Sequence, residues 1–282
     1  MEPEIMKDWG IARVEKNVIY AMHSGLALLL DVYHPEKPNG YGSVHISGSG
    51  WSAPLSADAR PLKEAGHVKA EAYPLAKAGY TMFTINHRAA PRFRYPAPVL
   101  DCQRAVRWIR ANAATYNIDP EHIGAIGGSS AGHLVAMLGV LDGEGDPNSN
   151  SEVEQQSASV QCVVARAGVY QFLGANRMLP LLGAHSPLKD DGSPEAAMAI
   201  EASPINYVSS TTPPTLLVHG TEDNIERSES FRDALQKVGA TTKLFPVEGA
   251  GHGPNYPDSK IDMSVIQAEY VAWFDQHLKV AT

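Results

Sequence analysis

The chain alternates short apolar runs with stretches of helical periodicity, and this rhythm limits the folds that it can adopt. Val18 to Met22 and Leu26 to Tyr33 are joined by His-Ser-Gly and predict an antiparallel hairpin. Helical patterns then alternate with apolar runs. These runs lie at residues 43–47, 80–86, 123–127, 161–167, 215–219 and 243–247. Because such alternation is typical of βαβ units, we expect an α/β fold with a central, mostly parallel sheet of about eight strands and helices on both faces.

Two segments interrupt this alternation. Residues 142–156 are rich in Gly, Asp, Asn, Ser and Glu, which predicts a solvated surface loop. Residues 51–68 directly follow an expected strand, and ligands of open α/β sheets sit at loops that leave the carboxyl ends of strands. We therefore expect residues 51–68 to form a rim of the active site. No repeat or linker divides the sequence, so residues 1–282 are expected to form a single domain.

Charge and composition exclude several classes of partner. The formal net charge is -8 and no basic cluster is present, which argues against nucleic acid and anionic membrane surfaces as partners. No segment approaches the ~20 apolar residues needed to span a bilayer. Residues 1–10 carry acidic and basic side chains and lack the pattern of a secretory signal, so a cytoplasmic location is expected. Cys102 and Cys162 have neither metal-site nor disulfide spacing, which predicts two buried thiols and no metal.

The segment 123–135 reads as an apolar strand, a Gly-x-Ser-x-Gly turn and the start of a helix. This is the context of a nucleophile elbow, in which glycines let the strand and helix backbones approach closely. Ser130 has glycine two residues away on both sides, whereas Ser129 fits a looser pattern with glycine before it and alanine after it. We therefore expect Ser130 to be the nucleophile, with Ser129 as the alternative register.

A serine nucleophile needs a base and an acid that orients the base. The apolar run 215–219 is followed within a few residues by Glu222 and Asp223. The final run, 243–247, is followed by His252 between two glycines, which would let a loop turn the imidazole inward. Both candidate acids and this histidine thus lie just past the ends of expected strands.

Two further histidines near the end of the chain are weaker candidates. His219 lies at a strand end directly before Gly220, which favours a packed, structural histidine over a base. His277 falls within the expected terminal helix, far from a cleft at the strand ends.

Taken together, these motifs resemble those of the α/β-hydrolase superfamily, and within it the hormone-sensitive-lipase-like carboxylesterases and acetyl-xylan-esterase-like members. In that arrangement the order along the chain is serine, acid, histidine. The resemblance implies an esterase triad of Ser130, Asp223 and His252, and position favours Asp223 over Glu222. It covers roughly Val18 to Phe274 and rests on residues 28–35, 47–51, 86–88, 95–97, 105–109, 129–134, 202–204, 219–223 and 249–253.

The oxyanion hole is expected from the N–H of Ala131, after the nucleophile, and from the loop that follows an early strand. That loop is Ser47-Gly48-Ser49-Gly50-Trp51, where the family has His-Gly-Gly-Gly-Trp. We expect the N–H groups of Ser49 and Gly50 to complete the hole. Trp51 and Tyr73 are candidates for the wall of the substrate pocket.

These inferences predict a serine esterase that cleaves short, acetyl-type esters through an acyl-enzyme, with acetylated sugars or xylan fragments as candidate substrates. The expected partner is a small-molecule or oligosaccharide ester, and the chemistry requires no metal or organic cofactor. An arylformamidase or small-peptide amidase would use the same triad. A non-catalytic binding protein on the same fold is the alternative of a different class. The sequence does not indicate an oligomeric state.

Overall fold

The computed structural model describes residues 3–174, 179–183, 188–256 and 258–279. They form an eight-stranded sheet in which the strands lie in the order β1-β2-β4-β3-β5-β6-β7-β8. The strands are β1 (Ile11–His23), β2 (Leu26–Pro35), β3 (Gly42–Ile46), β4 (Thr81–Ile85), β5 (Ile123–Gly128), β6 (Cys162–Arg166), β7 (Thr215–Gly220) and β8 (Thr242–Val247). β1 pairs antiparallel with β2, and β2 with β4, whereas the other pairs are parallel. The expected sheet and its N-terminal hairpin are confirmed.

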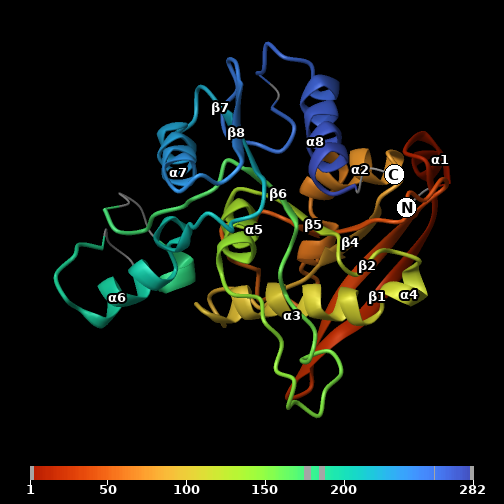
Figure 1. The fold of residues 1–282 in the computed structure, drawn as a ribbon, viewed down its shortest axis with the longest axis horizontal. Coiled ribbons are helices and arrows are strands. Elements are labelled where there is room, and N and C mark those ends of the chain that lie inside the picture. Colours follow the sequence, from red (N-terminus) through yellow and green to blue (C-terminus); the bar gives the residue numbers. More distant parts are fainter. Residues whose placement is uncertain (1–2, 175–178, 184–187, 257, 280–282) are drawn as a thin grey trace.

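Helices bury the sheet on both faces (Figure 1). They are α1 (Pro3–Asp8), α2 (Tyr73–Lys77), α3 (Ala97–Ala111), α4 (Ala113–Tyr116), α5 (Ser130–Val140), α6 (Pro194–Glu201), α7 (Glu226–Lys237) and α8 (Met263–His277). Shorter turns are η1 (Leu62–Glu64), η2 (Val68–Ala72), η3 (Pro180–Leu182) and η4 (Pro204–Tyr207). Neighbouring residues of a strand point to opposite faces. In β5, Ala125 packs in the core layer that contains α3, α5 and α7, and Ile126 in the layer that contains α2 and α8.

The segments that interrupted the sequence rhythm have different structures. Residues 142–156 contain no helix or strand, as predicted, and Glu154 of this loop pairs with Arg104 of α3 at 2.8 Å. The segment 51–68 is solvent-facing over residues 54–58 but also contains η1, where Lys63 is buried and its Nζ lies 2.7 Å from Asp31 Oδ1. Only part of the expected rim is therefore open to solvent.

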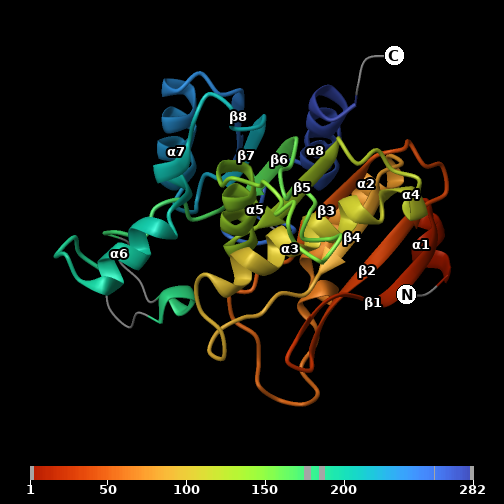
Figure 2. The same cartoon turned by 60° about the horizontal axis from the view of Figure 1, so that its bottom comes forward.

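Parallel pairing brings the carboxyl ends of β3, β5, β7 and β8 to one edge of the sheet. The loops that leave these ends carry the segments for which chemistry was predicted. At the side of the molecule, α6 projects away from the sheet in both views (Figures 1 and 2). Both cysteines are buried. Within the described ranges, no helix combines the length and apolar character that a membrane crossing would need.

Candidate active site

Ser129 occupies the bend between β5 and α5. Its backbone has φ 59° and ψ -123°, a conformation that residues other than glycine rarely adopt. The N–H of Ser129 donates to the carbonyl oxygen of Arg166, at the end of β6, at 2.7 Å. The helix begins at the next residue, Ser130. The strained backbone of an elbow therefore falls at Ser129.

The residues two before and two after Ser129 pack against each other. A Cβ added to Gly127 would lie 2.9 Å from the Cβ of Ala131 and 2.9 Å from the carbonyl oxygen of Ile46. Real Cβ atoms essentially never come so close, so position 127 must be glycine. Alanine fits at position 131 because its methyl group faces a residue without a side chain. The close approach expected of an elbow is made by Gly127 and Ala131.

The prediction that Ser130 stands at the bend is therefore wrong. Ser130 is the first residue of α5, and its side chain is 2% exposed. Its Oγ accepts a hydrogen bond from the N–H of Ser49 at 2.9 Å. Ser130 thus holds the loop after β3 beside the elbow, and the looser register of the motif is the one that the structure adopts.

His252 and Asp223 meet at Ser129. His252 Nε2 lies 2.8 Å from Ser129 Oγ, and His252 Nδ1 lies 2.6 Å from Asp223 Oδ2. The imidazole follows β8 and is 45% exposed, and the carboxylate follows β7 and is 12% exposed. The side chain of the alternative acid, Glu222, is exposed, and its N–H donates to the Ala250 carbonyl oxygen at 2.9 Å. Of the two candidate acids, Asp223 is the one that contacts the imidazole.

A second histidine contacts the same carboxylate oxygen. His219, at the end of β7, is fully buried, and its Nε2 lies 3.0 Å from Asp223 Oδ2. Its Nδ1 lies 2.7 Å from Ser228 Oγ of α7. The hydroxyl can donate to Nδ1, and this leaves the proton of the ring on Nε2, where it is donated to Asp223. His219 is a packed histidine, as the sequence suggested, but its contact with the acid was not predicted.

These contacts keep Asp223 charged. Burial alone would raise its pKa, but hydrogen bonds from His219, His252 and the Asn224 N–H hold the pKa well below its usual range. A charged carboxylate that accepts from His252 Nδ1 leaves Nε2 of that ring free to accept the proton of Ser129. Ser129, His252 and Asp223 thus form one continuous line of contacts from hydroxyl to imidazole to carboxylate.

The donors expected of the oxyanion hole are only partly arranged as predicted. With Ser129 at the bend, the following residue is Ser130 rather than Ala131. The N–H groups in the first turn of a helix have no intrahelical acceptor, and the dipole of α5 adds partial positive charge there. In the loop after β3, the N–H of Ser49 is engaged by Ser130 Oγ, and Gly50 is exposed with φ 64°.

The two aromatic candidates for the pocket wall differ in their surroundings. Trp51 is 2% exposed, its ring packs against Phe172, and its Nε1 donates to His133 Nδ1 at 3.0 Å. Tyr73 is 9% exposed and packs against Trp9 and Tyr33, with ring centroids 5.7 and 5.5 Å away. The prediction for Trp51 is wrong because the ring turns inward and completes the core. Tyr73 packs among aromatic side chains but also lines a cavity of about 470 Å³ together with Arg60 and Asn255.

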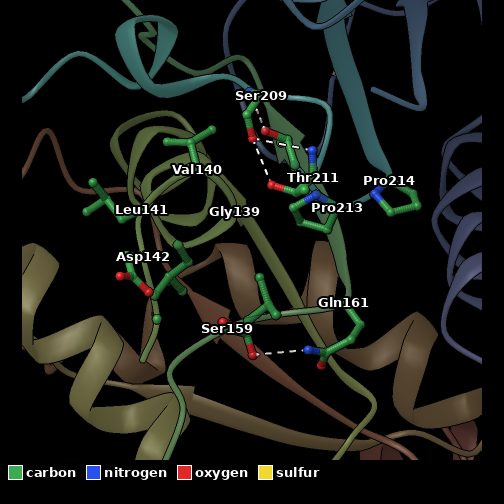
Figure 3. Close-up of a pocket in the computed structure, with 14 residues that line it drawn as sticks. Gly139, Val140, Leu141, Asp142, Ser159, Gln161, Ser209, Thr211, Pro213 and Pro214 are labelled. Atoms are coloured by element: carbon green, nitrogen blue, oxygen red, sulfur yellow. Dashed lines mark hydrogen bonds between the residues drawn. The ribbon is translucent and has the colours of Figure 1, made fainter. Parts of the chain in front are cut away.

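A cavity lies at the other end of the sheet. It has a volume of about 630 Å³ and is lined by the end of α5 and by residues that precede β6 and β7 (Figure 3). Its lining does not include Ser129, Asp223 or His252. Because these side chains lie at the carboxyl ends of the strands, the cavity is separate from them. In the described parts of the chain, no group of three or more His, Cys, Asp or Glu side chains is arranged to hold a metal ion.

Comparison with known proteins places the chain in a family. The model of the BD-FAE family matches residues 30–235. The chain belongs to the BD-FAE family. The sequence resemblance to α/β-hydrolases is thereby confirmed.

Individual relatives carry esterase names. The chain is 32% identical over 186 residues to esterase LipQ, and 30% identical over 185 residues to the probable carboxylic ester hydrolase LipM, both of Mycobacterium tuberculosis. These matches cover 62% and 61% of this chain but 44% and 42% of the relatives. The chain thus spans less than half the length of these relatives.

Solved structures match over nearly the whole chain. A truncated carbohydrate esterase from gut microbiota is 28% identical, with a TM-score of 0.70, and covers 94% of this chain and 97% of its own. An acetyl ester-xyloside bifunctional hydrolase from Caldicellulosiruptor lactoaceticus is 26% identical, with a TM-score of 0.77 and the same coverage.

Proposed function

We propose that this protein is a serine carboxylesterase in which Ser129 is the nucleophile, His252 the general base and Asp223 the orienting acid. The observation that carries the proposal is the continuous line of contacts from Ser129 Oγ through both ring nitrogens of His252 to Asp223 Oδ2, with the serine on a strained turn. The names of the family members and relatives support ester hydrolysis.

The proposed reaction proceeds in two halves. His252 Nε2 takes the proton of Ser129 Oγ as the oxygen attacks the ester carbonyl, and the resulting imidazolium returns the proton to the leaving alcohol. We assign stabilisation of the oxyanion to the N–H of Ser130, in the first turn of α5, and to the N–H of Gly50, because the N–H of Ser49 is already donated to Ser130 Oγ. Water then attacks the acyl-enzyme by the same proton transfers and releases the acid.

We propose that the substrates carry short, acetyl-type acyl groups, with acetylated sugars as a candidate class. Two similar structures, at 28% and 26% identity, carry the names of a carbohydrate esterase and an acetyl ester-xyloside hydrolase. Turnover of p-nitrophenyl esters with two to twelve or so carbons should peak at the short end, and acetylated xylo-oligosaccharides should release acetate. A maximum at eight carbons or longer would overturn the short-acyl assignment. Faster turnover of matched anilides would favour an amidase.

The serine assignment is tested by two variants of neighbouring residues. Ser129→Ala should lower kcat on the order of 10⁶-fold, because the nucleophile is lost while the fold is kept. Ser130→Ala should lose at most roughly tenfold in kcat, since only one hydrogen bond to loop 47–51 is removed. A fluorophosphonate probe should label the Ser130 variant and fail to label the Ser129 variant. The reverse pattern would return the nucleophile to Ser130.

A further inference from the structure

A buried ion pair lies directly behind the elbow. Arg166 is the last residue of β6 and is 1% exposed, and Glu71 of η2 is fully buried. Arg166 Nε donates to Glu71 Oε1 at 2.8 Å. A Cβ added to Gly128 would lie 2.3 Å from Arg166 Nη2 and 2.5 Å from Glu71 Oε1. The glycine that precedes Ser129 therefore makes room for these two charges.

Arg166 is bonded on both sides of the proposed catalytic contact. Its carbonyl oxygen accepts from the N–H of Ser129 at 2.7 Å. Its Nη1 donates to the carbonyl oxygen of Gly253 at 2.8 Å. Because Gly253 directly follows His252, one residue bonds the backbone of the proposed nucleophile and the backbone beside its base. The contacts among Ser129, His252 and Asp223 do not involve Arg166, so this link has a role of its own.

Glu71 fixes the guanidinium and is itself held from two sides. His45 of β3 lies 3.1 Å from Glu71 Oε2, and Nδ1 of His67 lies 3.0 Å from Oε1. His67 also lies against the loop after β3, since a Cβ on Gly48 would fall 2.9 Å from its Cε1. Burial alone would raise the pKa of Glu71, but the charges of His67 and Arg166 and these hydrogen bonds lower it well below its usual range. The carboxylate is therefore charged when it holds Arg166.

Stability alone does not account for such a pair. Removing two charges from water costs several kcal/mol for each ion, and well-packed apolar side chains often replace buried pairs without loss. The backbone carbonyl of Arg166 holds the elbow, whereas its guanidinium, fixed by Glu71, holds the histidine loop through the Gly253 carbonyl oxygen. An apolar side chain at position 166 could not make the bond to Gly253.

We propose that Arg166, oriented by Glu71, is a positioning residue that sets the distance between the His252 loop and the Ser129 elbow. The inference rests on the proposed function of Ser129 and His252. The Arg166–Glu71 pair keeps His252 Nε2 within hydrogen-bond distance of Ser129 Oγ. A displacement of about 1 Å in such a contact can cost on the order of 10²-fold in rate.

The first test replaces the guanidinium by a single amine. Arg166→Lys keeps the positive charge beside Glu71, but it replaces the rigid fork in which Nε reaches Glu71 and Nη1 reaches the Gly253 carbonyl by a single nitrogen on a flexible stem. We expect kcat to fall about 10²-fold, with KM changed less than about twofold. The matched control is Arg110→Lys. Arg110 is 8% exposed and donates to the carbonyl oxygens of Pro120 and Ser159 near the other end of β6. This control should keep the wild-type kcat.

A double-variant cycle then distinguishes an effect of Arg166 that acts through His252 from a loss of activity that is independent of His252. If Arg166 acts through the imidazole, adding Arg166→Lys to His252→Ala should change the remaining p-nitrophenyl acetate turnover by less than about threefold. A loss of the same factor in both backgrounds would overturn the proposal, as would wild-type kcat in Arg166→Lys alone.

A second variant covers the case in which Arg166→Lys fails to fold. If Arg166→Lys does not fold, the double variant Glu71→Gln/Arg166→Met leaves no unpaired buried charge, still lacks the donor to Gly253 and should show the same drop in kcat. Normal kcat in that double variant would overturn the proposal. Wild-type protein without esterase activity, or an active Ser129→Ala variant, would instead overturn the proposed function. Failure of the two proposals is thereby distinguishable.

Discussion

At the scale of single residues, the site depends on histidines that use both of their ring nitrogens in hydrogen bonds. Both ring nitrogens of His252 and both of His219 have partners, and the two rings meet at one oxygen of Asp223. Ser228 is fully buried and lies at the far end of this series. When this hydroxyl donates to Nδ1 of His219, the ring carries its proton on Nε2 and donates it to Asp223. A residue of α7 is thereby linked to the proposed acid through His219.

Ser228→Ala should therefore lower kcat without a matching change in KM. The loss of one hydrogen bond worth about 1 kcal/mol predicts a roughly fivefold to tenfold decrease, because His219 can then carry its proton on Nδ1 and no longer donate to Asp223. Steady-state kinetics on a short p-nitrophenyl ester measure the effect. Ser230→Ala is the control, since Ser230 is an exposed residue of the same helix and bonds only the Glu226 carbonyl within that helix. Equal kcat for the two variants would contradict this role for Ser228.

At the scale of elements, the junction of β5 and α5 is set by three close contacts of small residues. Gly127 faces Ala131, Gly128 faces the Arg166–Glu71 pair, and Gly132 lies against Gly168 after β6. Each contact explains one small residue of the motif. The sequence shows that several small residues are present, but spacing does not show which of them touch. For this reason the double-glycine frame around Ser130 was a misleading guide to the register.

Gly127→Ala tests this packing directly. The added methyl group would overlap Ala131 and the Ile46 carbonyl oxygen, so we expect a loss of about 1–3 kcal/mol in the free energy of unfolding and a lower kcat. Adding Ala131→Gly removes one of the two overlaps and should recover part of both quantities. Gly139→Ala, near the other end of α5, meets a Val163 methyl at 3.1 Å rather than the elbow, and should keep kcat unchanged. Chemical denaturation and kinetics on the same samples give both values. A Gly127→Ala variant with full stability and activity would contradict the packing argument.

At the scale of the whole molecule, local sequence signals predicted the elements and two of the three side chains that meet. The apolar runs identify strands because a parallel sheet covered on both faces needs continuous apolar residues. Asp223 and His252 could be found because they follow such runs. The inward turn of Trp51 could not be predicted, since its partners His133 and Phe172 come from distant segments. The Glu71–Arg166 contact joins residues 95 positions apart and likewise has no local signal.

The charge of Asp223 affects how the stability of the whole molecule responds to acid. The pKa of Asp223 is depressed in the folded protein. As the pH falls, Asp223 is therefore protonated first in the unfolded chain, where an aspartate has a pKa of about 3.9. The contribution of Asp223 to the free energy of unfolding is complete above that pH and is lost below it, by at most about 1.4 kcal/mol per pH unit before solvent screening reduces it. Unfolding free energies from pH 6 to 3 should fall less steeply in Asp223→Asn than in the wild type. Glu222→Gln, at the neighbouring exposed carboxylate, should follow the wild type. Parallel curves for Asp223→Asn and the wild type would show that the partners of Asp223 do not stabilise its charge.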